Sequence, residues 1–288
     1  MISSLVQYHP RSFREFCYVY PVVSRRSGGL SLGVNLSLSG QCTFSCVYCQ
    51  VIAEGGQKQI DVNSDFIDFD DLKSELCQLI GMINNGSLFQ DSWFSLLPVE
   101  KRGLKDIAFS GDGEPTLSSA FPEAVRCVAA VRRQLCNEAV KIVLITNGTM
   151  LHTKHVQNAI ESMLENNGEI WAKLDAGTPE YFQTIARSSI KYEKILDNLT
   201  TLTKRFPAVI QSCFISIQGQ PPDNSEIKQY AQRLMSLQTN NILRIQIYTT
   251  ARNTPEQWVS PLNNEQLDSI AETVRNLTGL QVDTFYSN

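Results

Sequence analysis

Apolar and polar positions follow two periods along this chain, and the periods alternate almost from end to end. An apolar residue at every second position, or a short continuous apolar run, predicts a strand, whereas a spacing of three to four predicts a helix. The predicted strands cover residues 30–39, 106–110, 141–146, 169–175, 209–217, 242–249 and 280–286. The predicted helices cover residues 69–84, 120–136, 152–166, 178–186, 192–205, 225–238 and 265–277.

Repeated strand-then-helix units favour a parallel sheet with right-handed crossovers. We count six such units and a terminal strand, whereas a closed barrel of this kind has eight. The predicted fold is therefore α/β, an open, partial (β/α)6 barrel of the TIM type. We expect one domain over residues 1–288, with an N-terminal extension at 1–29, the barrel core at 30–250, and a C-terminal helix and strand at 251–288. Residues 84–99 show no clear period and predict a surface insertion.

Composition narrows the class of protein. The 288 residues are 42% hydrophobic, which suffices for a sizeable core, and the net charge of −4 weakens the case for a polyanionic partner such as RNA. No apolar run approaches the roughly 18–20 residues that span a bilayer. The first ten residues lack a basic stretch followed by an apolar one, as a secretory signal would have. We therefore expect a cytoplasmic protein that does not associate with membranes.

Cysteine usage fits the same compartment, because a chain of this size and apolar content does not need a disulfide framework. Five of the eight cysteines are scattered through apolar or helical segments and are expected to pack in the core, as free cysteines usually do. These five are Cys17, Cys77, Cys127, Cys136 and Cys213.

The other three cysteines, Cys42, Cys46 and Cys49, follow the first predicted strand with the spacing C-x3-C-x2-C. Ferredoxin-type runs supply four thiolates, so that every iron of a cluster is covered. Three thiolates on a short loop leave the fourth iron of a cubane open, which is what a reactive site needs. The alternatives are a structural zinc site and three unrelated core cysteines. Zinc requires a fourth ligand, and the three histidines lie far away in sequence, although Glu54 and Asp61 lie within reach.

Five further polar groups lie at later strand ends. Because functional groups gather at the carboxyl ends of parallel strands, we expect them to face one mouth together with the cysteines. The five are Gly111-Asp112-Gly113-Glu114-Pro115, Thr146-Asn147-Gly148, Lys173 with Asp175, Gln218-Gly219, and Gln246 with Tyr248 and Arg252.

Each of these groups has a structural and a functional interpretation. The two glycines Gly111 and Gly113 either form a strand-to-helix turn or let the backbone approach a ligand, with carbonyl groups free to accept from an ammonium group. Thr146 and Asn147 either contact the ligand or simply form a turn. The arginines Arg25, Arg26, Arg244 and Arg252 are either surface residues or clamps for an anion.

Lys173 and Asp175 flank Leu174 at the end of an apolar strand. Side chains two positions apart in a strand lie on one face. Two charges on one face of a central strand predict that this face lines a polar cavity, and the alternative is a solvated salt bridge. Arg244 and Gln246 repeat the pattern on a later strand.

These residues resemble the radical S-adenosylmethionine (radical SAM) superfamily. The cysteine spacing with Tyr48 just before the last cysteine is similar to its cluster signature, and Asp112-Gly113-Glu114-Pro115 is similar to its Gly-Gly-Glu-Pro segment. The predicted partial barrel is the fold of that superfamily. Ser24-Arg25-Arg26, the segments 32–36, 173–180 and 259–262, and Cys49-Gln50 resemble a small single-cluster subgroup related to wyosine-base-forming and molybdenum-cofactor enzymes.

The resemblance implies two cofactors, a 4Fe-4S cluster and S-adenosylmethionine. It implies that Cys42, Cys46 and Cys49 hold the cluster, that segment 111–115 binds the amino group of S-adenosylmethionine, and that Tyr48 lies by the adenine. Lys173 or Asp175 would reach the ribose, and Thr146, Asn147, Gln218 and Gln246 complete the expected cofactor-binding set. One electron, supplied by a partner such as a flavodoxin or ferredoxin, would release methionine and a 5′-deoxyadenosyl radical that takes hydrogen from a small or mid-sized substrate. The resemblance assigns no catalytic residue.

Departures from the relatives narrow the reaction. Asp112 replaces a glycine, and only Cys17 precedes the cysteine loop, which argues against the second cluster of wyosine-forming enzymes. The later cysteines form no C-x2-C pair, and the last residues lack the cysteine triad and Gly-Gly tail of the molybdenum-cofactor enzymes. Two other functions stay open: modification of a nucleobase in RNA, with tRNA as a less favoured partner, and a non-catalytic iron–sulfur or zinc protein. Arg25, Arg26, Lys58, Arg244 and Arg252 are the residues available for an RNA track.

Overall fold

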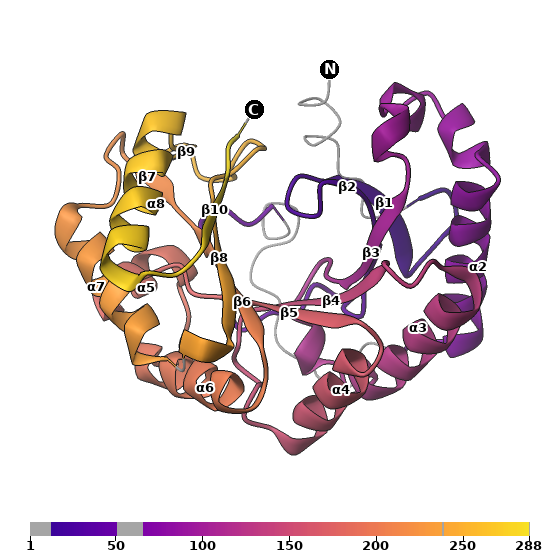
Figure 1. The fold of residues 1–288 in the computed structure, drawn as a ribbon, viewed down its shortest axis with the longest axis horizontal. Coiled ribbons are helices and arrows are strands. Elements are labelled where there is room, and N and C mark those ends of the chain that lie inside the picture. Colours follow the sequence, from indigo (N-terminus) through magenta and orange to yellow (C-terminus); the bar gives the residue numbers. More distant parts are fainter. Residues whose placement is uncertain (1–12, 51–65, 238, 288) are drawn as a thin grey trace. The chain divides into compact units, whose positions relative to one another are not determined.

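The computed structural model describes residues 13–50, 66–237 and 239–287, and it divides into two compact units. The first unit comprises Met1–Gln41, Gln59–Ile145 and Thr153–Glu169. The second comprises Cys42–Lys58, Thr146–His152 and Ile170–Asn288. Each unit combines parallel strands with helices that follow them in the chain, as Figure 1 shows.

Strands in the first unit run in the order β1 (Val19–Ser24), β2 (Gly29–Val34), β3 (Leu104–Phe109) and β4 (Lys141–Thr146). β1 is antiparallel to β2, whereas β2, β3 and β4 are parallel. The six residues of β2 are all buried, as expected for a parallel strand that is covered on both faces. β1 lies in the predicted N-terminal extension, where the pattern had suggested no strand.

Helices α2 (Phe69–Asn84), α3 (Phe121–Leu135) and α4 (Lys154–Leu164) lie side by side along these strands, as Figure 1 shows. Asp68 caps α2 by accepting from the amides of Asp70 and Asp71. Glu75 in α2 is buried and accepts from three successive amides, those of Cys17, Tyr18 and Val19, which joins the helix to the start of β1. The predicted insertion at 84–99 forms the short 3-10 helices η2 (Ser87–Gln90) and η3 (Phe94–Leu96), followed by η4 (Val99–Lys101).

Strands in the second unit run in the order β5 (Gly168–Lys173), β6 (Ala208–Cys213), β8 (Ile242–Tyr248) and β10 (Val282–Phe285), and all are parallel. The first two residues of β5, Gly168 and Glu169, belong to the first unit. The helices of this unit are α5 (Pro179–Ala186), α6 (Tyr192–Arg205), α7 (Asn224–Ser236) and α8 (Asn264–Thr278), with α7 packed against α8. A short 3-10 helix, η6 (Thr239–Asn241), precedes β8. Among the described residues, β2, β3, β4, β5, β6 and β8 are the six strands of the predicted partial barrel, so the fold class is confirmed.

Two predicted strands differ from those observed. The strand predicted at 30–39 ends at Val34, because Asn35 and Ser37 form a turn in which the Ser37 amide donates to the Asn35 side chain. The strand predicted at 209–217 is two strands, β6 and β7 (Ile215–Ile217). β7 leaves the parallel sheet and pairs antiparallel with β9 (Val259–Pro261). Alternating apolar residues continue through both breaks, so periodicity alone does not locate them.

No helix among the described residues is long and apolar enough to cross a membrane.

Candidate functional site

The cysteine loop of the second unit is fixed by backbone hydrogen bonds to the carboxyl end of α5. The Ser45 amide donates to the Ala186 carbonyl at 2.8 Å, and the Val47 amide donates to the Ile185 carbonyl at 3.0 Å. Arg187, the residue after α5, adopts the left-handed conformation that often ends a helix. The last carbonyls of a helix lack partners within it, so the loop satisfies groups that α5 leaves free.

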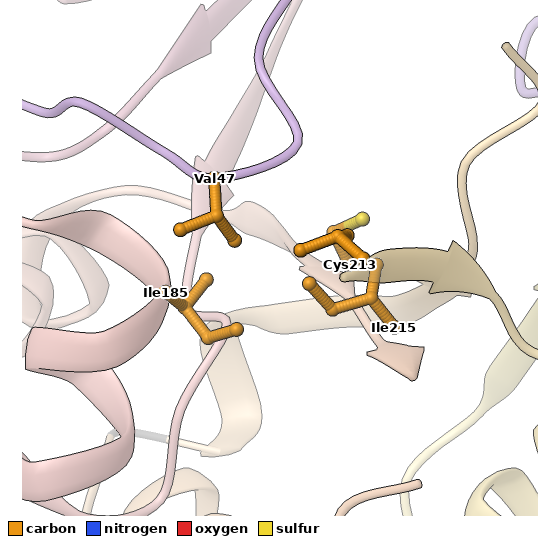
Figure 2. Close-up of a cluster of buried hydrophobic side chains, with 5 residues drawn as sticks. Val47, Ile185, Cys213 and Ile215 are labelled. Atoms are coloured by element: carbon orange, nitrogen blue, oxygen red, sulfur yellow. The ribbon is translucent and has the colours of Figure 1, made fainter. Parts of the chain in front are cut away.

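Val47, which lies between Cys46 and Tyr48 in the sequence, also anchors the loop through its side chain. Figure 2 shows Val47 directed from the loop toward Ile185, Cys213 and Ile215, with which it forms a buried hydrophobic cluster that also includes Val259. Burying an aliphatic side chain of this size contributes about 1.5–3 kcal/mol. The loop that carries the cysteines is therefore packed on the core of its own unit.

Asn147 contacts the first cysteine. Its amide nitrogen lies 3.4 Å from the Cys42 sulfur and 3.0 Å from the Thr43 hydroxyl. Its amide oxygen accepts from both the backbone and the hydroxyl of Thr149, which fixes the orientation of the amide group. Thr146 has a structural role instead, because its hydroxyl accepts from the Gly148 amide and stabilises the turn after β4.

Lys173 contacts the second cysteine, Cys46, which is buried. The Lys173 ammonium lies 3.6 Å from the Cys46 sulfur, donates to the Tyr48 hydroxyl at 2.6 Å, and lies 3.3 Å from an Asp175 carboxylate oxygen. Tyr48 donates its hydroxyl hydrogen to the same Asp175 oxygen. The other Asp175 oxygen accepts from the Cys213 amide at 2.8 Å, at the end of β6. The strand predicted at 169–175 ends at Lys173, so Asp175 lies just beyond β5, and the two charges predicted to share one face meet each other and the loop.

Burial and charge set the protonation of this group. Burial raises the pKa of the Cys46 thiol to about 11, and the Lys173 ammonium acts in the opposite direction. Burial and the Asp175 carboxylate raise the pKa of the Tyr48 hydroxyl. Burial alone would lower the pKa of Lys173, but the Asp175 carboxylate more than compensates, and the pKa lies well above its usual value. Lys173 is therefore a cation and Tyr48 a neutral hydroxyl at neutral pH.

A row of polar side chains crosses the sheet of the second unit from Lys173. Lys173 is in register with Gln211 on β6, Gln211 with Gln246 on β8, and Gln246 with Asp283 on β10. Residues in register on parallel strands lie on the same face of the sheet. The Gln211 amide donates to the Gln246 amide oxygen at 2.6 Å, and both residues are buried. Arg244 pairs with Asp283 at 3.5 Å.

The segment 111–115 belongs to the first unit, where it follows β3. The Glu114 amide donates to the Gln41 carbonyl at 2.8 Å, and Gln41 immediately precedes Cys42 in the chain. A side chain at Gly113 would meet that same carbonyl oxygen at 2.1 Å, so only glycine allows the approach. The Glu114 carboxylate accepts from the amide and the hydroxyl of Thr116 and so caps a short 3-10 helix, η5 (Pro115–Leu117).

Several other predicted residues lie elsewhere or have partners of their own. Gln218 is exposed, adopts a left-handed conformation at the turn after β7, and donates its amide to the Trp258 carbonyl. Arg252 donates to the Gln50 side chain at 2.8 Å, next to the third cysteine. Tyr248 packs against the hydrophobic cluster to which Val47 belongs. Arg25 and Arg26 belong to the first unit, and Lys58 lies outside the described residues.

The sequence did not single out several residues that hold the site. Gln211 joins the polar row, and its signal was a large polar side chain within a buried strand. The Thr43 and Thr149 hydroxyls lie 3.0 Å apart, and the Ser188 hydroxyl donates to the Thr43 carbonyl. Asn198 of α6 donates to the carbonyls of Gly148 and Thr149. These threonine, serine and asparagine residues occur in patterns typical of any loop or helix, so their role is visible only in three dimensions.

The donor set fits an iron–sulfur cluster in two respects. Thiolates are the usual ligands of such clusters, and all three candidate ligands belong to one loop of one unit. N–H groups also lie near two of the sulfurs, from Asn147 at Cys42 and from Lys173 at Cys46, and hydrogen bonds to sulfur are a common feature around such clusters. Among the residues that the structure describes, no three His, Cys, Asp or Glu side chains form a site for a single metal ion.

Comparison with curated proteins gives three distant relatives, and no protein-family model matches the chain. The chain is 26% identical over 233 residues to UPF0026 protein slr1464 of Synechocystis sp., covering 79% of this chain and 74% of that protein. It is 24% identical over 261 residues to UPF0026 protein MJ1312 of Methanocaldococcus jannaschii, covering 90% and 71% respectively. A GTPase Obg of Brachyspira hyodysenteriae is 22% identical over 265 residues, which are 91% of this chain but only 34% of that protein. This chain contains no G-x4-G-K-[ST] segment of the kind that binds nucleoside triphosphates.

Solved structures share the fold. A structure of TYW1 with a lysine-pyruvate adduct bound aligns with a TM-score of 0.52 at 16% identity, covering 87% of this chain and 74% of that chain. A crystal structure of archaeal TYW1 aligns with a TM-score of 0.50 at 15% identity, covering 87% and 73%. At these identities the likenesses show the fold alone, and that fold is the partial barrel that the sequence predicted.

Proposed function

We propose that this protein is a radical SAM enzyme that acts on a small or mid-sized substrate. The observation that carries the proposal is the cysteine loop itself. Its three cysteines lie on one packed loop, and nitrogen donors from two strand ends reach two of their sulfurs. A packed loop with an incomplete thiolate set suits a cluster that leaves one iron open to a ligand.

In this proposal Cys42, Cys46 and Cys49 hold a 4Fe-4S cluster. When bound and reduced by a flavodoxin or ferredoxin, the cluster supplies the electron that cleaves S-adenosylmethionine to methionine and the 5′-deoxyadenosyl radical that abstracts hydrogen from the substrate. The protein fixes the loop, through Val47 and through the carbonyl groups at the end of α5. It also supplies the amide nitrogen of Asn147 and the ammonium group of Lys173 near the sulfurs.

Three further predicted groups, segment 111–115, Tyr48 and Gln246, would bind S-adenosylmethionine in the same proposal. On the resemblance, the backbone carbonyl groups of segment 111–115 would accept from the amino group, and the ring of Tyr48 would contact the adenine. Gln246 belongs to the polar row that begins at Lys173, and it offers a buried amide to a ligand on that face of the sheet. Amide side chains both donate and accept hydrogen bonds, so this face suits polar ligands.

The test is anaerobic reconstitution with iron and sulfide, followed by metal analysis and incubation with dithionite and S-adenosylmethionine. We expect four irons and four sulfides per chain, on the ligand count of a cubane, and formation of 5′-deoxyadenosine. Cys46→Ala should lose the visible absorbance and the deoxyadenosine. Cys77→Ser, which alters a cysteine on α2 in the other unit, should keep both. One zinc per chain, or a cluster without deoxyadenosine, would contradict the proposal in favour of a non-catalytic metal protein.

Modification of a nucleobase in RNA is the second candidate. The fold likeness to the TYW1 structures and the sequence resemblance to wyosine-base-forming enzymes favour it. The net charge of −4 is against it, since nucleic-acid binding usually relies on a basic surface. Arg252 donates a hydrogen bond to Gln50, the residue after Cys49, and is therefore a candidate for an RNA contact beside the cysteine loop.

A further inference from the structure

Lys173 and Asp175 form a charged pair directly against one of the cysteines. The Lys173 ammonium lies 3.6 Å from the Cys46 sulfur and 3.3 Å from Asp175, and Tyr48 bridges the two charged groups through its hydroxyl. The resemblance to relatives places this pair at the ribose of S-adenosylmethionine. Here, the polar atoms of both side chains instead engage the cysteine loop and the end of β6.

Both charged groups are largely shielded from water. The side chain of Lys173 is 16% exposed and that of Asp175 is 8% exposed. The energy of interaction between charges rises as the surrounding dielectric constant falls, so a charge in this position acts more strongly on its neighbours than a surface charge does. Salt in solution also screens such a buried charge less.

We propose that Lys173 and Asp175 are positioning residues that set the reduction potential of the cluster held by Cys46, with effects of opposite sign. The inference rests on the proposed function. Reduction adds one electron and therefore one negative charge to the cluster. The Lys173 cation stabilises that charge and raises the potential, whereas the Asp175 anion opposes it and lowers the potential. Hydrogen bonding and local charge are known to move the potentials of iron–sulfur proteins in general.

The geometry also explains why the pair is held so tightly. Tyr48 donates to Asp175 and accepts from Lys173, so the hydroxyl fixes the separation of the two charges. The Cys213 amide fixes the second Asp175 oxygen. A pair that only braced the loop would need hydrogen bonds but no particular balance of charge. The two interpretations therefore predict different results when charge is changed and shape is kept.

The test is an anaerobic redox titration of the reconstituted protein, followed by electron paramagnetic resonance of the reduced cluster in the absence of S-adenosylmethionine. Lys173→Met should shift the potential to a more negative value, and Asp175→Asn should shift it to a less negative one. Lys173→Arg, which keeps the charge, should stay near the wild-type potential. If Lys173→Met does not take up iron, Lys173→Gln removes the charge while keeping an N–H group and allows the same comparison.

Lys141→Met is the matched control, because Lys141 also lies on a strand and pairs with a carboxylate, Glu169 at 2.7 Å, but in the other unit. Its potential should equal that of the wild type. Equal potentials in all variants, or shifts of the same sign in Lys173→Met and Asp175→Asn, would overturn the inference. A wild-type protein that holds the cluster and forms 5′-deoxyadenosine would then leave the proposed function intact, whereas a wild type without a cluster would overturn both.

Discussion

Asp112 is the residue at which the chain departs from the Gly-Gly-Glu-Pro segment of the family that it resembles. The Asn35 amide nitrogen donates to the Asp112 carboxylate at 2.8 Å, and the Asp112 amide donates back to the Asn35 side-chain oxygen at 3.3 Å. Gly111 adopts a positive φ of 137°, and a side chain there would meet Asn35. Asp112 therefore braces the loop after β3 through its contacts with Asn35.

Gly113 makes the most sterically demanding contact of this loop. Gly113→Ala would place a carbon 2.1 Å from the Gln41 carbonyl oxygen, so the backbone must shift and the hydrogen bond from Glu114 is strained. Overpacking of this kind costs about 1–3 kcal/mol. We expect a lower melting temperature and weaker binding of S-adenosylmethionine, measured by thermal denaturation and calorimetry. Gly103→Ala, where an added carbon meets nothing within 4 Å, should behave like the wild type, and equal effects of the two would refute the steric explanation.

At the scale of elements, a chain of contacts runs from α7 through α5 to the cysteine loop. Glu226 of α7 is buried and accepts from the Gly177 amide at 2.5 Å and the Thr178 hydroxyl at 2.6 Å, at the amino end of α5. Burial raises the pKa of Glu226, and the hydrogen bonds from Thr178 and Gly177 oppose that shift. The carboxyl end of α5 in turn accepts from the loop amides of Ser45 and Val47. Helix α5 thus links a buried carboxylate to the cysteines.

Removing the Glu226 carboxylate should therefore destabilise the cysteine loop indirectly, through helix α5. Glu226→Ala leaves a buried amide unpaired, which costs about 1–3 kcal/mol. We expect a lower melting temperature and a faster release of iron to a chelator than in the wild type. Glu180→Ala removes an exposed carboxylate from the first turn of α5, and it should change the melting temperature and the rate of iron release by far less. Unchanged iron release in Glu226→Ala would show that α5 does not transmit stability to the loop.

The element scale also separates what periodicity predicts from what it misses. The alternation of strands and helices, including β5, β6 and β8, followed from the apolar pattern because that pattern reflects which face each segment buries. The break between β6 and β7 did not follow from the apolar pattern, because both strands are apolar and differ only in the strands with which they pair. β1 was missed because Pro21 interrupts its apolar run, and proline occurs in strands chiefly at the edge of a sheet, which is where β1 lies.

At the scale of the whole molecule, charge separates the two candidate functions. The net charge of −4 suits a small substrate better than a polyanion, although electrostatic binding depends on how charges are distributed over the surface. In the described residues, Arg244 pairs with Asp283 and Arg252 donates to Gln50. Two of the arginines proposed for an RNA track therefore already have partners.

Binding of tRNA is the measurement that decides between these candidates. If the substrate is a small molecule, we expect no retardation of tRNA at low salt and no dependence of 5′-deoxyadenosine formation on added tRNA. Phosphate contacts release counterions, so genuine tRNA binding would appear as a shift that weakens steeply with salt. Such a shift, lost in Arg252→Ala but kept in Arg205→Ala on the α6 surface, would favour nucleobase modification instead.

The sequence by itself determined the alternation of the six barrel strands with helices, and the three cysteines with their spacing, because each depends on residues that are neighbours in the chain. It also indicated that Lys173 and Asp175 share a face, since side-chain direction along a strand alternates with a period of two. Only the tertiary structure decided that Asn147 meets Cys42 and that Lys173 meets Cys46, contacts that join residues 105 and 127 positions apart. Such contacts depend on how strands and helices pack, and packing is set by the summed burial of many side chains rather than by any one motif.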